Sequence, residues 1–73
     1  MKIKIIASHP VDGQEGITNY IGNVYETLQL NKYYDNNIVK EMKELREVAV
    51  YLDQNDKRIS ILNQNEYEII EGV

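Results

Sequence analysis

The chain has 73 residues, no cysteine and a formal net charge of −4. This length allows one small domain, and the lack of cysteine excludes disulfides and thiolate metal sites, so stability must come from burial of apolar side chains. The acidic balance disfavours nonspecific attraction to nucleic acid or to an anionic membrane.

The apolar runs are too short for a transmembrane helix or a signal peptide, so we expect a cytoplasmic protein without a membrane partner. The chain is rich in Asn, Ile, Lys and Tyr and has neither Trp nor Phe. This usage is typical of an AT-rich coding sequence, which predicts a low-GC bacterium or its phage as the source.

A first strand is predicted at residues 2–7, followed by a long loop over residues 8–19. Polar and apolar side chains alternate at the start of the strand, which is the period of a half-buried strand. Ile3 and Ile5 therefore share the face expected to be buried. The loop is predicted from its Pro, Gly and Asp residues, which favour turns.

The second strand is predicted at residues 22–30. Val24 and Leu28 share one face of this segment with Glu26. The apolar pair predicts that this face is buried. Glu26 then lies either at the rim of a barrel or beside a β-bulge that shifts the register.

One helix is predicted at about residues 37–46, because Ile38, Met42 and Leu45 recur at helical spacing. The asparagine pair ahead of Ile38 can cap its N-terminus. A helix of this length is unstable alone, so we expect it to dock on the sheet through Met42 and Leu45. The charged residues of this segment are interpreted as a solvated face: Lys40, Glu41, Lys43, Glu44 and Arg46.

A hairpin and a final strand complete the predicted elements. Residues 48–52 and 58–62 have strand patterns and flank a polar turn, and residues 68–71 form a short last strand. Within the hairpin, we expect Val50, Ile59 and Ile61 to be buried, which is consistent with alternation along both strands.

The order of these elements resembles an SH3-like barrel. Residues 61–70 are similar to the SH3 passage from the fourth strand, through a single 3₁₀ turn, to the fifth strand, and Tyr67 takes the place of the family's binding tyrosine. Residues 22–26 resemble the second strand of bacterial and phage SH3-like proteins. The resemblance implies a mainly β fold over residues 1–73: a small five-stranded SH3-like barrel with an inserted helix at about 37–46 and a 3₁₀ turn before the last strand.

The chain departs from the SH3 domains that bind proline-rich peptides. It has no Trp, residues 5–9 replace the Ala-Leu-Tyr-Asp-Tyr segment, and Gln64 stands near the position of the family's proline. The aromatic groove that receives a polyproline helix is therefore largely missing. The resemblance carries over the fold but not the peptide-binding function.

No catalytic, cofactor or metal site is predicted. Ser8, His9 and Asp12 have the residue types of a catalytic triad, but one loop rarely holds a nucleophile, a base and an orienting group together. The segment from Asp53 begins like a calcium loop, yet Arg58 occupies its obligatory glycine position. A single histidine excludes an imidazole metal site within one chain. We therefore expect a protein that is not an enzyme.

Six tyrosines are the sole aromatic residues of the chain. Tyrosine packs at the rims of small barrels and is enriched at interfaces. Tyr33 and Tyr34 lie in a polar link, where a structural role is less expected. We predict that Tyr33, Tyr34 and Tyr67, with Tyr20 as a further candidate, converge on one side and bind a partner. In the alternative, these rings cover the open ends of the barrel.

The sequence favours a non-enzymatic protein-interaction module, encoded by a phage or mobile element, that modulates a host protein. Another protein is the expected partner, with self-association as an alternative. The second hypothesis is a nucleic-acid-associated SH3-like module of the translation or transcription type, which clustering of Lys2, Lys4, Lys57 and Arg58 would favour. The acidic segment 48–73 could also mimic nucleic-acid phosphates, although plain solubility explains it as well.

Overall fold

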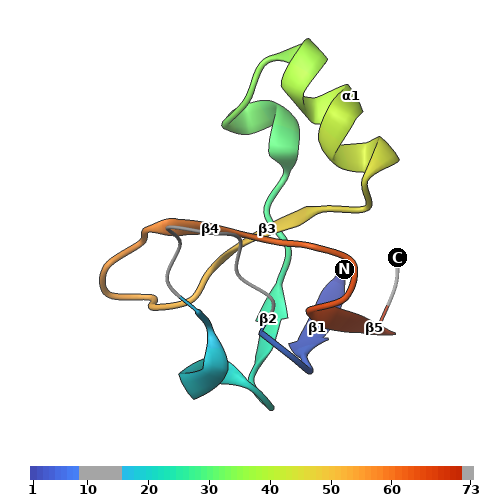
Figure 1. Cartoon of the computed structure of the whole chain (residues 1–73). Coiled ribbons are helices and arrows are strands. Elements are labelled where there is room, and N and C mark those ends of the chain that lie inside the picture. Colours follow the sequence, from blue (N-terminus) through green and yellow to red (C-terminus); the bar gives the residue numbers. More distant parts are fainter. Residues whose placement is uncertain (9–15, 72–73) are drawn as a thin grey trace.

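The computed structural model describes residues 1–8 and 16–71. Within these ranges the fold is mainly β, with five strands in two antiparallel sheets, one α-helix and two 3₁₀ segments (Figure 1). The elements in chain order are β1 (Lys2–Ile5), η1 (Thr18–Tyr20), β2 (Val24–Glu26), η2 (Leu30–Lys32), α1 (Asn36–Glu44), β3 (Val48–Tyr51), β4 (Ile59–Leu62) and β5 (Tyr67–Glu71). The mainly β class with one short helix is thus confirmed.

Two sheets form the body of the molecule. The first has the order β2-β1-β5, and the second is the hairpin β3-β4. Beyond the end of β2, the Leu28 N–H donates to the Ala49 carbonyl at 2.8 Å and links the two sheets. The Ile6 N–H donates to the Glu66 carbonyl at 2.9 Å and extends the pairing of β1 with β5 within the first sheet. Among the described residues, the two sheets form separate ladders.

The core lies between the two sheets. Ile3 and Ile5 lie on the central strand of the first sheet and are fully buried, because their face packs against buried side chains of the hairpin. Six buried side chains of the described residues pack together: Ile3, Ile5, Ile17, Val48, Val50 and Leu62. The expected burial of Ile3, Ile5 and Val50 is confirmed. Each such side chain contributes about 1.5–3 kcal/mol to stability.

The predicted inner face of the second strand is wrong. Val24 is 49% exposed, and Leu28, which lies beyond the strand, is half-buried. The register pairs Ile3 with Tyr25 and Lys4 with Val24, and residues that pair across strands share a face. Tyr25 therefore faces the core, where its hydroxyl donates to the Leu52 carbonyl at 3.1 Å. The tyrosine ring packs against the core in place of the valine.

The inner face of β4 differs in the same way. Ile61 is 45% exposed and Ile59 is half-buried, whereas Leu62 is fully buried. The register pairs Leu62 with Val48 and Ser60 with Val50, so Leu62 and Ser60 share the core side. Both faces of β4 carry apolar residues, and alternation alone selects the wrong one.

The helix begins one residue earlier than predicted and is capped by a different residue. The Asp35 side chain accepts the Ile38 N–H at 3.0 Å, so the cap is Asp35 and neither Asn36 nor Asn37. A carboxylate at this position also interacts favourably with the positive end of the helix dipole.

The helix ends early because the chain turns sharply at Arg46. Its N–H donates to the Lys43 carbonyl at 3.2 Å, and the Glu47 N–H donates to the Met42 carbonyl at 2.8 Å. This pair of bonds is a Schellman motif. Arg46 adopts a φ of 57° there, a left-handed conformation that costs a residue with a Cβ atom about 1–2 kcal/mol.

Only one of the two predicted docking residues of the helix is buried. Val39 and Met42 are buried, but Leu45 is 51% exposed. Leu45 lies at the C-cap, just before the turn at Arg46, so it falls outside the buried stripe. Figure 1 shows α1 beside η2 at one end of the molecule, set apart from the sheets.

The predicted 3₁₀ turn before β5 is a single hydrogen-bonded turn with one bond between residues three apart. The Glu66 N–H donates to the Asn63 carbonyl at 3.0 Å, and the Asn63 side chain accepts the Asn65 N–H at 2.9 Å. The Asn63 N–H donates to the buried Glu66 carboxylate at 3.1 Å. These local side-chain bonds support the turn that leads into β5.

Candidate partner-binding groove

A groove of about 910 Å³ separates α1 from the ends of the strands. Its walls come from α1 and the turn after it, from the segment that follows β2, and from the adjoining ends of β1, β3 and β5. The apolar part of the lining consists of Met1, Leu28, Leu30, Val39, Val48, Tyr67 and Ile69. The groove therefore lies where the helix leaves the end of the core uncovered.

Ile69 provides exposed apolar surface in this groove. It pairs with Ile3 and thus belongs to the core side of the sheet, yet it is 58% exposed. The register of β5 then jumps, because Lys2 pairs with Glu71 and leaves Ile70 as the extra residue. Ile70 is also exposed but does not line the groove. The bulge gives two neighbouring isoleucines different surroundings.

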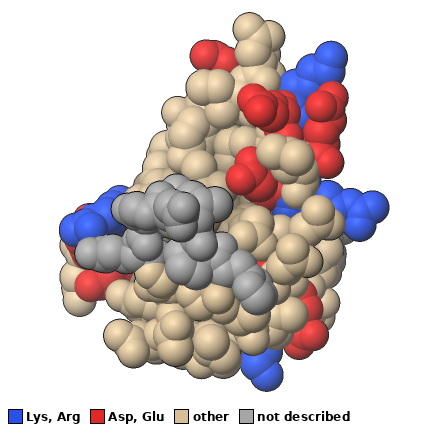
Figure 2. All heavy atoms as spheres, in the orientation of Figure 1, with Lys and Arg blue, Asp and Glu red and all other residues tan. Residues whose placement is uncertain are grey.

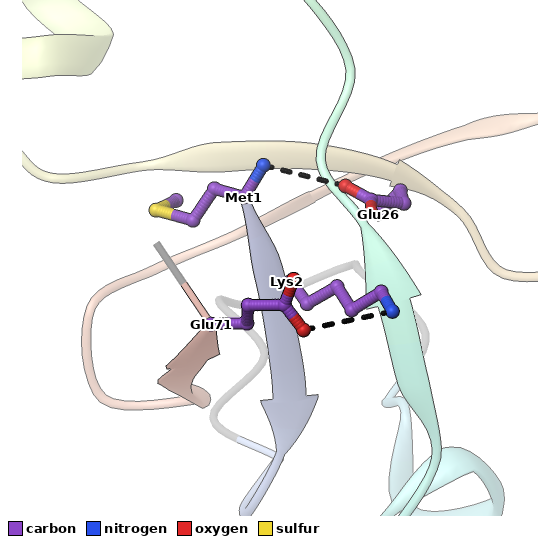
Figure 3. Close-up of polar contacts among 4 residues, drawn as sticks. All are labelled: Met1, Lys2, Glu26 and Glu71. Atoms are coloured by element: carbon purple, nitrogen blue, oxygen red, sulfur yellow. Dashed lines mark hydrogen bonds and ion pairs between the residues drawn. The ribbon is translucent and has the colours of Figure 1, made fainter. Parts of the chain in front are cut away.

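Two ion pairs hold the edge of the sheet beside the groove (Figure 3). The Met1 amine lies 3.3 Å from the Glu26 carboxylate, and the Lys2 ammonium lies 3.7 Å from the Glu71 carboxylate. Both pairs bridge neighbouring strands at solvent-exposed positions, where such pairs contribute less than about 1 kcal/mol. They pair the Met1 amine and the Lys2 ammonium with carboxylates.

A hydrogen bond joins the turn after α1 to β5 in the lining of the groove. The Tyr67 hydroxyl donates to the Arg46 carbonyl at 2.6 Å. Burial raises the pKa of Tyr67, and the positive charge of Arg46 opposes this shift. The left-handed turn and the tyrosine therefore form one wall of the groove.

Two cations of the groove wall lack a carboxylate partner. Within residues 1–8 and 16–71, neither Lys43 nor Arg46 forms an ion pair, whereas Arg58 pairs with Asp56 at 3.1 Å. Glu47 supplies the one carboxylate among the lining residues. The groove is thus locally positive in a chain whose net charge is −4.

Tyr33, one of the predicted partner-binding residues, forms an exposed aromatic pair with Tyr51. Their rings meet edge to face, with centroids 6.4 Å apart and an interplanar angle of 87°. The Tyr51 hydroxyl donates to the Tyr33 hydroxyl at 3.1 Å, and this hydrogen bond raises the pKa of Tyr51. The next residue, Tyr34, is half-buried, and its N–H donates to the Leu30 carbonyl at 3.0 Å.

Tyr20 lies elsewhere. It belongs to η1, packs against the core and lines a separate cavity of about 220 Å³. Figure 1 places η1 and η2 at opposite ends of the molecule, so Tyr20 does not converge with Tyr33 and Tyr34. Of the four predicted tyrosines, only Tyr67 lines the large groove. Binding of a partner by these tyrosines stays a prediction.

Sequence reasoning missed Arg46, Lys43 and Ile69. The two cations were interpreted as part of a solvated helix face, because their place beside the strand ends depends on how the helix returns to β3. A glycine usually marks a left-handed helix end, and this chain has Arg46 there instead. The sequence offers one signal for Ile69. Ile69 and Ile70 are adjacent in the last strand, so they point to opposite faces and cannot both enter the core.

The residues considered for catalysis or metal binding have other roles or lie outside the described ranges. The Ser8 hydroxyl accepts the Ile17 N–H at 2.8 Å and closes the first loop. His9 and Asp12 lie outside the described residues. Among residues 1–8 and 16–71, no three His, Cys, Asp or Glu side chains are grouped as metal ligands. In the same part of the chain, no helix has the length and apolar character to cross a membrane.

Comparison with known proteins finds no matching family model, no similar curated protein and no similar solved structure. The functional argument therefore starts from the geometry of the groove.

Proposed function

We propose that this chain is a non-enzymatic protein-interaction module with an SH3-like barrel arrangement, and that its partner binds in the groove between α1 and the strand ends. The module acts in the cytoplasm of a low-GC bacterium, where a phage or mobile element encodes it to modulate a host protein. The observation that carries the proposal is the exposed apolar lining of the groove, above all Ile69 on the core side of the sheet.

The strand order supports the SH3-like arrangement. In this chain, as in an SH3-like barrel, the first strand lies between the second and the fifth, and the third and fourth strands form a hairpin. The Leu28–Ala49 hydrogen bond joins the segment after β2 to β3, as expected where one long strand passes from one sheet to the other.

The surface chemistry of the groove supports binding of a partner. An open apolar groove bounded by a helix and strand ends suits insertion of side chains from a peptide segment. Aromatic and arginine side chains are enriched at interfaces, and Tyr67 and Arg46 stand side by side here. The lining also includes Leu28, Leu30 and Ile69, and burying these apolar side chains against a partner is favourable.

A matched pair of substitutions tests the proposal. Ile69→Gln places a polar amide in the groove, whereas Ile70→Gln makes the same change on the neighbouring residue outside it. Both residues are exposed, so we expect both variants to melt close to the wild-type temperature. The immobilised chains are used to capture proteins from the lysate of a low-GC bacterium.

The expected result is a host protein retained by the wild type and by Ile70→Gln but lost by Ile69→Gln. Equal retention by all three proteins, or no retained protein at all, would contradict the proposal. Circular dichroism of both variants controls for the fold.

The nucleic-acid-associated alternative receives less support. Lys2 and Arg58 are held by carboxylates, and basic atoms are scattered over the visible face while acidic atoms gather near the α1 end (Figure 2). We therefore expect duplex DNA to bind no tighter than about 10⁻⁴ M at physiological salt. A micromolar dissociation constant in a fluorescence titration would favour the alternative.

A further inference from the structure

We propose that the groove accepts a partner segment that carries both an apolar side chain and a carboxylate, with Arg46 and Lys43 holding the carboxylate. This inference rests on the proposed function, because it assumes that the groove is the partner site. It adds the chemical class of the segment that binds there.

The charges of the groove require an anion from the occupant. Lys43 and Arg46 both line the groove and form no ion pair with any described residue. Glu47, the one carboxylate of the lining, can balance the charge of only one of them. An occupant that covers this wall removes water from both cations, and a buried unpaired charge is strongly unfavourable. A carboxylate on the occupant removes this penalty, and a second cation there would increase it.

The backbone at Arg46 gives an independent reason to assign a role to its side chain. The residue occupies the left-handed position of a Schellman motif, which glycine adopts without steric conflict. Arginine is disfavoured in this conformation, and strained residues cluster at functional sites. Arginine also binds a carboxylate through two parallel hydrogen bonds, which neither glycine nor asparagine can offer.

The rest of the groove specifies the apolar half of the segment. Ile69 of β5 and, from the segment after β2, Leu28 and Leu30 offer aliphatic surface. The Tyr67 hydroxyl donates to the Arg46 carbonyl, so its hydrogen is already used. Lys43 and Arg46 are the charged side-chain donors of the lining, so the carboxylate binds them, and the apolar side chain packs on the aliphatic surface.

A displayed random peptide library, selected on the immobilised full chain, tests this chemistry. We expect the enriched peptides to contain Asp or Glu close to Leu, Ile, Val, Phe or Met. Enrichment of peptides without a carboxylate, or no enrichment over the unselected library, would overturn the inference.

Affinities of the most enriched peptide, measured by fluorescence anisotropy, then identify the residues involved. Arg46→Gln and Lys43→Gln are each expected to weaken binding about tenfold, because a hydrogen bond to a charged group is lost. Lys40→Gln is the matched control, since Lys40 is exposed on α1 but does not line the groove. An equal loss for Lys40→Gln and Lys43→Gln would show only a general charge effect and would overturn the assignment.

Arg46→Gly separates a binding role from a structural one. Glycine relieves the left-handed backbone, so we expect a higher melting temperature together with weaker peptide binding. A higher melting temperature with unchanged binding would overturn the role of Arg46.

The Ile69→Gln variant distinguishes failure of this inference from failure of the proposed function. If enriched peptides lack a carboxylate but lose binding in Ile69→Gln, the groove remains the partner site and only the acidic chemistry is wrong. If Ile69→Gln binds the enriched peptide as the wild type does, both proposals are wrong.

Discussion

The two ends of this small protein are built differently. In the sheets, Ile3 and Ile5 are fully buried, and β1 is paired on both edges. At the α1 end, the apolar Leu45 is more than half exposed, and so is Ile69 of β5 where that strand lines the groove. The difference indicates that the sheets provide most of the stability, while the α1 end leaves apolar and basic groups available for a partner.

The largest effect is expected from shortening a core residue. Ile5→Ala should lower the free energy of unfolding by about 2–5 kcal/mol, because it leaves a cavity among side chains that cannot collapse fully. Leu45→Ala is the matched control at the α1 end, and we expect it to change stability by less than about 1 kcal/mol. Urea unfolding measures both. Similar losses would mean that the two ends do not differ.

A smaller effect is expected from removing the helix cap. Asp35→Ala takes away the acceptor for the Ile38 N–H, which should cost about 0.5–2 kcal/mol. The loss should appear as faster amide hydrogen exchange in α1, with little change in β1. Asp35→Asn retains an acceptor and should restore most of the protection. Uniform acceleration throughout the sheets would show that α1 and the sheets unfold as one unit.

The pH dependence of stability is expected to contain a contribution from Tyr67. Its pKa is raised in the folded chain, so the folded state holds the hydroxyl proton more tightly than the unfolded state. The contribution is fully present below the unfolded value of about 10 and is lost as the pH rises through the folded pKa. Tyr67→Phe should flatten the alkaline part of the curve and cost about 0.5–1.5 kcal/mol at neutral pH. An alkaline curve unchanged by Tyr67→Phe would contradict this assignment.

A similarly small effect on stability is expected at Tyr33, which is exposed, and Tyr34, which is half-buried. The double change Tyr33→Ala, Tyr34→Ala removes the edge-to-face contact with Tyr51, which is worth about 0.5–1.5 kcal/mol. If these residues bind a partner, capture is lost while the melting temperature changes little. Unchanged capture together with a loss of several kcal/mol would instead show that the rings serve the fold.

The sequence was sufficient to predict the five strands and the helix, but neither the 3₁₀ segments η1 and η2 nor the inner faces of two strands. Alternation and β-branched residues located all five strands, and the period of the apolar residues located α1. The faces of β2 and β4 were wrong because each has apolar side chains on both sides. For β2 the choice depends on Tyr25, whose hydroxyl needs the Leu52 carbonyl, a partner that only the tertiary structure provides.

The groove could not be predicted for a related reason. It depends on the sharp turn at Arg46, which places Lys43 and Arg46 beside the end of β5. The usual sequence signal for such a turn is glycine, and it is missing here. The tyrosines were a partial guide, because Tyr67 lines the groove and Tyr20 lies at the other end of the molecule.

Native-state hydrogen exchange tests the contrast between the two ends most directly. We predict that β1 amides exchange only through global unfolding, with a free energy equal to that from urea unfolding. Amides of α1 should exchange through a smaller local opening, because Val39 and Met42 are the only side chains that bury this nine-residue helix among the described residues. Equal protection in α1 and β1 would contradict the account, since the helix would then belong to the same cooperative core as the sheets.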